Sequence, residues 1–192
     1  MFYQILNTMK KFLFAMLLLS QVTLAQNKIF ICKDGTSTFF SETPIENIEA
    51  TSKTLSGIIN TTNNEVSFLV AMKSYKFEKP LMQEHFNEKY IESDKYPNAT
   101  FKGKINETID YTKDGTYNVT ATGVLTIHGV DKNRIEKGTL TINGEQISLN
   151  TKFDVNLVDH NIEVPKIVVA QIAKTIKVTN TCIFTPYIAR NK

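Results

Sequence analysis

Three histidines and two cysteines are the side chains of this sequence with the widest chemical scope: His85, His128, His160, Cys32 and Cys182. Two histidines need further ligands to hold a metal ion, and the spacing of the other residues supplies no third one. No C-x-x-C pair, G-x-S-x-G motif or H-E-x-x-H motif occurs. The sequence therefore predicts a protein that is not an enzyme, with no metal site, no catalytic residue and no cofactor.

Each histidine has a structural explanation beside a binding one. His85 lies on the apolar side of an expected helix, where it either hydrogen-bonds the polar end of a ligand or is tied to a backbone carbonyl group. His128, directly before Gly129, either contacts the same ligand or stabilises a turn. His160 is expected in a loop. Buried polar groups usually hydrogen-bond to nearby protein groups. The structural explanation is therefore preferred for both His85 and His128.

Residues 1–25 have the three parts of a secretory signal peptide. Lys10 and Lys11 precede an apolar run over residues 12–19, and a small-x-small ending follows at residues 23–25. The apolar run is too short for a permanent membrane anchor. We expect cleavage to leave residues 26–192 as one periplasmic or secreted domain with no stable membrane span. A buried N-terminal helix is the alternative, and Met9 is an alternative start to Met1.

Cys32 and Cys182 lie near the two ends of the expected mature chain. Export to an oxidising compartment would permit a disulfide between them. The bond would close a very long loop, which is worth up to about 4–5 kcal/mol in the chain-entropy model. Two buried free thiols on separate strands are the alternative.

The charge of the chain argues against a nucleic-acid partner. The formal net charge is +3 at pH 7. It falls to +1 for the mature chain, because residues 1–25 contain two lysines and no acidic residue. The mature part has no run of lysine or arginine, and nucleic-acid binding needs a clustered basic surface.

Alternation of apolar and polar residues with period two dominates the mature chain. It marks residues 66–72, 99–105, 117–122 and 147–157, and a last run ends near Phe184. Such runs predict half-buried strands of an antiparallel sheet. Asp114-Gly115, Asn143-Gly144 and the segment 33–35 favour tight hairpin turns. The expected fold class is therefore all-β, a sandwich or a barrel with an apolar interior that is either filled or open to a ligand.

Two segments break this alternation. Pro80–Ser93 is expected to form a helix, with Pro80 in its first turn and with Glu84, Glu88 and Glu92 on a solvated face. Residues 165–174 form either a shorter helix or a strand, because their β-branched residues also favour strands.

Two motifs carry a resemblance to a known family. They are HFNEKYIESDKYPNATFKGKI, from His85 to Ile105, and GVLTIHGVDK, from Gly123 to Lys132. A histidine-bearing helix that leads to a Pro-x-Ala-Thr-Phe strand, followed by a Leu-Thr-Ile-His-Gly-Val strand end, resembles the YceI family of exported bacterial proteins. The resemblance covers about residues 28–187.

The resemblance implies a lipocalin-like antiparallel β-barrel of about eight strands, with one or two short capping helices. It implies binding of a long apolar isoprenoid-type lipid, such as an isoprenoid quinone or a polyprenyl lipid, and it implies that a homodimer can form. Where many members carry Arg-Asp ahead of the helix histidine, this chain has Met82 and Gln83, which favours a neutral polar end over a pyrophosphate. The expected lipid-binding residues are Phe68, Val70, Met72, Leu81, Met82, His85, Phe86, Tyr90, Phe101, Leu125, His128, Phe153 and Val155.

Two functions follow from these expectations. The first is non-catalytic carriage of the lipid in the barrel channel in the periplasm. The second is a stress-response or interaction protein whose barrel is filled by its own side chains and carries no lipid.

Overall fold

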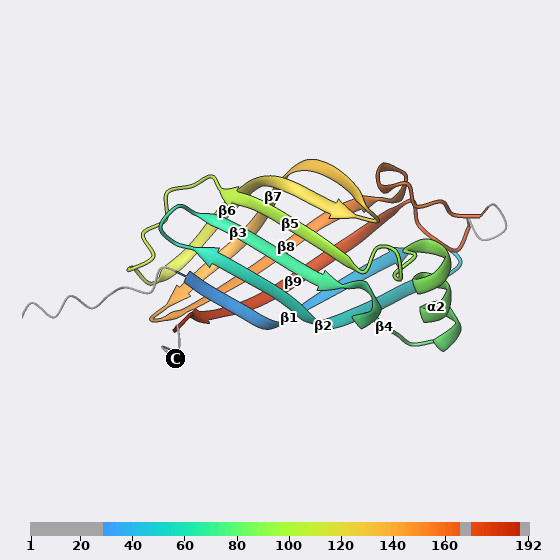
Figure 1. The fold of residues 1–192 in the computed structure, drawn as a ribbon, viewed down its shortest axis with the longest axis horizontal. Coiled ribbons are helices and arrows are strands. Elements are labelled where there is room, and N and C mark those ends of the chain that lie inside the picture. Colours follow the sequence, from blue (N-terminus) through green and yellow to red (C-terminus); the bar gives the residue numbers. More distant parts are fainter. Residues whose placement is uncertain (1–28, 166–169, 189–192) are drawn as a thin grey trace, which may run out of the picture.

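The computed structural model of this chain describes residues 29–165 and 170–188. Within them the chain forms nine β-strands, which Figure 1 shows wrapped into an elongated barrel with a helical cap at one end. The strands are β1 (Ile29–Glu42), β2 (Asn47–Asn60), β3 (Glu65–Ala71), β4 (Lys76–Phe77), β5 (Asn98–Ile105), β6 (Gly115–Ile127), β7 (Val130–Asn143), β8 (Gln146–Asn156) and β9 (Thr175–Pro186).

Neighbouring strands run antiparallel, and the sheet closes on itself. The order is β1-β9-β8-β7-β6-β5-β3-β2, and β2 pairs back with β1. The two-residue strand β4 only adds to the edge of β2, so eight strands form the ring. Closure removes the long free edges of a sheet and turns every second side chain towards one interior. The predicted all-β antiparallel barrel of about eight strands is therefore confirmed.

The tight turns of the barrel use residues with positive φ. The tight turn predicted at Asn143-Gly144 lies one residue later: Gly144 (φ 57°) and Glu145 join the paired residues Asn143 and Gln146 at the ends of β7 and β8. His128 (φ 51°) and Gly129 (φ 71°) form a two-residue turn between β6 and β7. Two consecutive positive φ values match the twist of antiparallel strands, and glycine adopts them without steric cost.

The turn predicted at residues 33–35 is wrong. These residues lie inside β1, where the pairing register shifts on both sides of Gly35 and produces a bulge. A Cβ atom at Gly35 would lie 2.8 Å from Cys182 Sγ, so the bulge needs a glycine for a close approach instead of a turn. Asp114-Gly115 likewise ends a longer loop between β5 and β6 and does not form a two-residue hairpin.

The cap is a short helix that changes its hydrogen-bonding pattern. Helix α2 (Pro80–His85) begins at a proline, whose missing N–H is not needed at a helix start. It continues as the π-helical turn η2 (Phe86–Tyr90), in which the Ile91 N–H donates to the Phe86 carbonyl at 2.9 Å. The chain then leaves the helix at Glu92, with a φ of 47°. The helix predicted over Pro80–Ser93 therefore exists but ends three residues early.

The second predicted helix is not observed in the part of the segment that can be described. Residues 170–174 form turns and bends before β9 begins, and residues 166–169 lie outside the described residues. Helix α2 is therefore the one α-helix of the described residues, which also include the 3₁₀ helices η1 (Met72–Ser74) and η3 (Leu157–His160). No helix of these residues is long and apolar enough to cross a membrane.

The interior is packed at one end of the barrel and hollow at the other. Phe184, Ile59, Leu140 and Ile147 are almost fully buried and fill the end where β1 begins and β9 finishes. At the cap end, inward side chains instead surround a cavity of about 300 Å³. The barrel is thus filled in one part and open in the other.

A glycine pair brings β5 and β6 unusually close together. Gly103 and Gly123 are register partners. A Cβ atom at Gly103 would lie 2.5 Å from the Thr122 carbonyl oxygen. The Phe101 ring lies over both glycines, at 2.8–2.9 Å from such Cβ positions. The barrel wall therefore has no room for side chains at this contact.

Both cysteines are buried in the interior, and Cys182 also lines the cavity. Cys32 of β1 and Cys182 of the adjacent strand β9 are buried free thiols in this structure. Burial and the neighbouring Cys32 thiol raise the pKa of Cys182 well above its usual range. A disulfide between them stays a prediction.

Candidate functional site

The candidate site is the cavity at the cap end of the barrel. Its wall consists mainly of aromatic and aliphatic side chains, and its volume of about 300 Å³ is at the lower end of the range for ligand pockets. The structure brings eleven of the thirteen predicted lipid-binding residues together around it: Phe68, Val70, Met72, Met82, His85, Phe86, Tyr90, Phe101, Leu125, Phe153 and Val155. They come from β3, from the 3₁₀ helix η1 (Met72–Ser74) that follows it, from β5, β6 and β8, and from the cap.

The other two predicted residues lie elsewhere. The Leu81 side chain belongs to the outer face of α2, and the residue is 59% exposed. His128 sits in the β6–β7 turn, where its ring contacts two protein acceptors described below. Neither residue lines the cavity.

An aromatic cluster attaches the cap to the barrel wall. Phe86 of η2 stacks on Phe39 of β1 with ring centroids 5.3 Å apart, and it also contacts Phe77 at 5.0 Å and Tyr75 at 5.9 Å. The Tyr75 hydroxyl shares a 2.7 Å hydrogen bond with Ser37 inside the barrel, and burial raises the pKa of this tyrosine. Phe86 is the one member of this cluster that the sequence predicts as a binding residue. Phe39 was overlooked because the bulge in β1 interrupts the alternation that would have placed it inside.

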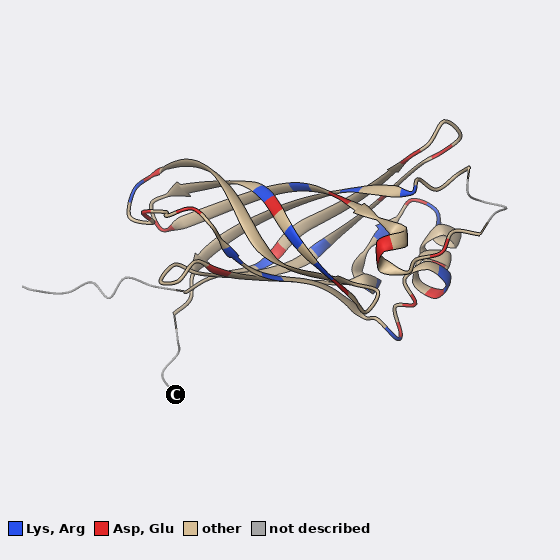
Figure 2. Cartoon of the chain, turned by 90° about the horizontal axis from the view of Figure 1, so that it is seen from above, with Lys and Arg blue, Asp and Glu red and all other residues tan. Residues whose placement is uncertain are grey.

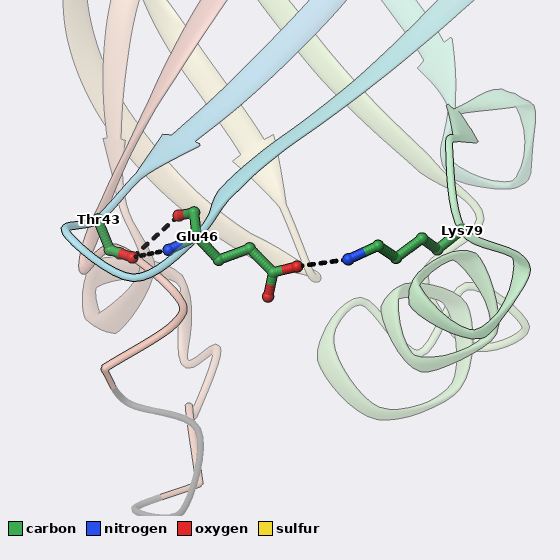
Figure 3. A network of polar contacts seen from close by, with 3 residues as sticks. All are labelled: Thr43, Glu46 and Lys79. Carbon is green, nitrogen blue, oxygen red and sulfur yellow. Dashed lines mark hydrogen bonds and ion pairs between the residues drawn. The ribbon is translucent and has the colours of Figure 1, made fainter.

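A polar contact joins the cap to the β1–β2 turn on the other side of the mouth. Figure 3 shows Lys79, directly before α2, extended towards Glu46. The Nζ to Oε1 distance is 2.7 Å, and the pKa of Lys79 is raised by this partner. Thr43 accepts the Glu46 N–H and donates to its carbonyl oxygen, which fixes the turn. An ion pair on the protein surface therefore borders the entrance of the cavity. Ion pairs of this kind contribute little to stability.

His85 lines the cavity and has no hydrogen-bond partner in the described part of the chain. The backbone tie that sequence reasoning preferred for it is therefore not seen. A half-buried imidazole without a partner at the mouth is free to contact the polar part of a ligand.

His128 ties the β6–β7 turn to two other segments. Its Nε2 lies 2.8 Å from Oε2 of Glu92, and its Nδ1 lies 3.0 Å from the His160 carbonyl oxygen. Both partners are acceptors, so the ring donates from both nitrogens when both bonds form. The Tyr96 ring packs on the imidazole at 4.5 Å. Glu92 is thus a turn partner, and its expected place on a solvated helix face is wrong.

We expect the His128→Ala variant to lose stability and keep its ligand. Two hydrogen bonds of a side chain that is 9% exposed would be lost, which costs about 1–3 kcal/mol of unfolding free energy. Urea unfolding measures the loss, and ligand titration of the same sample measures uptake. Reduced uptake at unchanged stability would instead make His128 a ligand contact.

His160 makes the fold sensitive to acid. The residue is completely buried, its Nε2 has no partner in the described residues, and burial lowers its pKa below 6.5. Below pH 6.5 the unfolded chain then binds a proton that the folded chain does not, so stability is full above this pH and falls as the pH decreases.

We expect urea midpoints of the wild-type protein to decrease between pH 7.5 and pH 5.5 more than those of the His160→Leu variant. Leucine cannot titrate, so the difference between the two proteins isolates the histidine. An equal decrease in both would contradict this assignment.

The barrel wall has a slot beside the cavity. The pairing between β7 and β8 stops at Gly138 and Thr151, although both strands continue towards the cap end. In the described residues, the remaining contacts across the slot include an Arg134 Nη2 bond to the Asp154 carbonyl oxygen at 2.9 Å. The cavity reaches the exposed Lys137 at this slot and the exposed Gln171 beside the cap.

The sequence of residues 31–184 matches the YceI-like domain family. The chain belongs to this family. No curated protein matches the sequence as a relative. Among the described residues, no group of three or more His, Cys, Asp or Glu side chains could hold a metal ion.

Solved structures share the fold at low sequence identity. A polyisoprenoid-binding domain from Saccharophagus degradans, implicated in plant cell wall breakdown, superposes with a TM-score of 0.69 at 14% identity, covering 84% of this chain and all of that one. Burkholderia cenocepacia BcnA gives 0.66 at 14% identity over 78% of this chain and 95% of its own. The Campylobacter jejuni YceI protein gives 0.59 at 18% identity over 77% and 90%.

Proposed function

We propose that this YceI-like protein is a non-catalytic carrier that binds a long apolar chain of the isoprenoid type in the cap-end cavity. The observation that carries the proposal is the apolar cavity itself, which reaches the protein surface beside the cap and at the slot. Transfer of an apolar chain from water to such a wall contributes about 25 cal/mol per Å², before ordering costs. The printed description of the Saccharophagus degradans neighbour as a polyisoprenoid-binding domain supports the class of cargo.

A cavity of about 300 Å³ would hold only part of a long prenyl chain. The remainder would leave through the mouth between the cap and residues 171–172, or through the slot. Met82 lines the mouth, and Gln83 accepts the Phe77 N–H at 3.4 Å, so neither supplies a cation for a pyrophosphate. These contacts support a cargo with a neutral polar end.

The same cavity argues against the alternative of a barrel filled by its own side chains. That function would need an interior packed along its whole length, whereas an apolar cavity of about 300 Å³ lies inside this barrel. The features that remain for a role without cargo are exposed apolar side chains such as Ile183, and nothing in the fold gives them a partner.

Native mass spectrometry of the protein expressed with its own signal peptide tests the proposal, together with organic extraction of the same sample. The expected result is an additional bound mass that is extracted as a prenyl lipid. A mass without cargo, together with no uptake of added quinones or polyprenols, would contradict the carrier function. Fractionation of the same cells tests the periplasmic location that the signal peptide at residues 1–25 leads us to propose.

A further inference from the structure

The slot between β7 and β8 is closed at both of its ends. At the inner end, Gly138 and Thr151 form the last pair of the β7–β8 ladder. At the cap end, η3 follows β8 directly and reaches across to β7, where His160 Nδ1 lies 3.3 Å from the Val130 carbonyl oxygen. The slot is therefore a bounded opening in the side wall of the barrel.

A side chain spans the slot where backbone pairing would be expected. If the ladder continued in its register, Ile135 would be the partner of Asp154. Instead, Arg134 Nη2 donates to the Asp154 carbonyl oxygen at 2.9 Å and also lies 2.9 Å from Oε1 of Glu136. An arginine side chain reaches farther than a backbone N–H group, so the two strand edges lie farther apart here than in a ladder.

The apolar cavity reaches the surface on the inner side of this arginine bridge. Lys137 is exposed and nevertheless lines the cavity, together with Gly138 and Thr151. Phe153 and Val155 line the cavity along the β8 edge of the slot. The cavity therefore has an exit through the side wall in addition to the mouth beside the cap.

Exposed apolar side chains flank the slot on the outside. Ile135 on its β7 edge is 65% exposed, and Val158 of η3 at its cap end is 71% exposed. Single exposed apolar residues are common on protein surfaces, but these two stand beside an opening into an apolar cavity. Figure 2 shows charged residues of both signs along β7, where this strand crosses in front of the barrel. These mixed charges do not favour an ionic ligand over an apolar one.

We propose that the slot is the exit through which the apolar tail of a long prenyl cargo leaves the barrel, to lie against Ile135 and Val158. The inference rests on the proposed carrier function and gives the two openings different parts of the cargo. The polar end stays at the mouth beside the cap, where His85 lines the cavity. The tail gains affinity in proportion to the apolar area that it removes from water. A cargo longer than the cavity is thus held without opening the packed end of the barrel.

An extended peptide is the other occupant that two facing strand edges would suit, because it pairs with their free backbone groups. Such a strand would have to displace the Arg134 bridge to the Asp154 carbonyl group. It would also leave the apolar cavity behind the slot unoccupied. These two contacts favour the prenyl tail.

Two prenols with the same hydroxyl end and different lengths test the proposal: farnesol, with fifteen carbons, and solanesol, with forty-five, both presented in the same detergent micelles. The slot is closed by a disulfide in the Lys137→Cys/Lys152→Cys variant, because these exposed positions would form the next pair of the ladder. We expect the oxidised variant to bind farnesol as the wild-type protein does and solanesol about tenfold more weakly. Reduction of the same sample should restore solanesol binding. Wild-type protein, oxidised and reduced in parallel, controls for Cys32 and Cys182.

A surface substitution tests the outer contact without a cross-link. Ile135→Asp should weaken solanesol binding about tenfold and leave farnesol binding unchanged, because only the longer chain meets the new carboxylate. The matched control is Ile183→Asp, at a position that is 52% exposed on the outer face of β9. It should change the affinity for neither prenol.

The outcomes separate this inference from the carrier function. Equal solanesol affinity with the slot open and closed, an equal loss of both prenols on closure, or no effect of Ile135→Asp would overturn the proposal. Each of these results would leave the carrier function intact and make an extended peptide the next occupant to test. Binding of neither prenol by the wild-type protein would contradict the carrier function itself.

Discussion

The Phe153→Asp variant is expected to fold and to lose at least about 100-fold in affinity for a prenyl ligand. Phe153 of β8 faces the cavity in its hollow part and is only half-buried, so the packed end of the barrel does not depend on it. An apolar chain that enters would strip water from the new carboxylate, which costs several kcal/mol. Titration with a fluorescent prenyl analogue measures the affinity, and circular dichroism checks the fold.

The control for this experiment is an aspartate on the outer face of the barrel. Ile183 of the neighbouring strand β9 is 52% exposed and points away from the interior. Ile183→Asp adds the same charge without entering the cavity, so its affinity should match that of the wild-type protein. Unchanged uptake in a folded Phe153→Asp variant would contradict binding inside the barrel.

The Gly123→Val variant is expected to lose about 3 kcal/mol or more of unfolding free energy. A Cβ atom at Gly123 would lie 2.6 Å from the Gly103 Cα and against the Lys102 carbonyl oxygen. These are backbone atoms of the paired strand β5 that cannot rotate away, so the two strands would have to separate. The midpoint of urea unfolding measures the loss.

Gly144→Ala provides the comparison. Gly144 also carries a constrained backbone, with a φ of 57°, but a Cβ atom there would meet nothing within 4 Å. The Gly144→Ala variant should therefore lose only about 1 kcal/mol of unfolding free energy, because alanine is less stable than glycine in the left-handed conformation. If both substitutions cost the same, the close approach of β5 and β6 would not be the origin of the effect.

Strands with an uninterrupted apolar face could be read from the sequence. In β3 and β5, apolar residues or glycine at every second position do face the interior, as in Val66, Val70 and Ile105. This periodicity, together with the two family motifs, predicts the barrel fold and most of the residues of the cavity wall. Period two is directly a property of the strand backbone, so no tertiary information is needed to detect it.

The strands that carry polar or charged residues on their inward face could not be predicted from this periodicity. The inward face of β7 includes Arg134 and Glu136, and that of β1 includes Ser37 and a bulge at Gly35. Polar residues inside a barrel erase the contrast between the two faces of a strand. The segments that break the pattern therefore include the part of β7 that borders the slot.

The cap and the turns were missed in part for local reasons. His128 was expected to stabilise a turn, and it lies in the β6–β7 turn itself with a positive φ, which is uncommon for residues other than glycine. Its ring is held by Glu92 and by the His160 carbonyl, residues that lie more than thirty positions away in the sequence. Sequence spacing carries no signal for such contacts.

The two ends of the barrel chain meet at the pole opposite the cap. The Tyr187 N–H donates to the Ile29 carbonyl oxygen at 2.8 Å, which joins the start of β1 to the end of β9. Figure 1 shows the C-terminal end on this side and α2 on the other. A linker attached directly before Ile29 or directly after Tyr187 would therefore hold the barrel by the pole opposite the cap. The cap and the entrance of the cavity would then face away from the point of attachment.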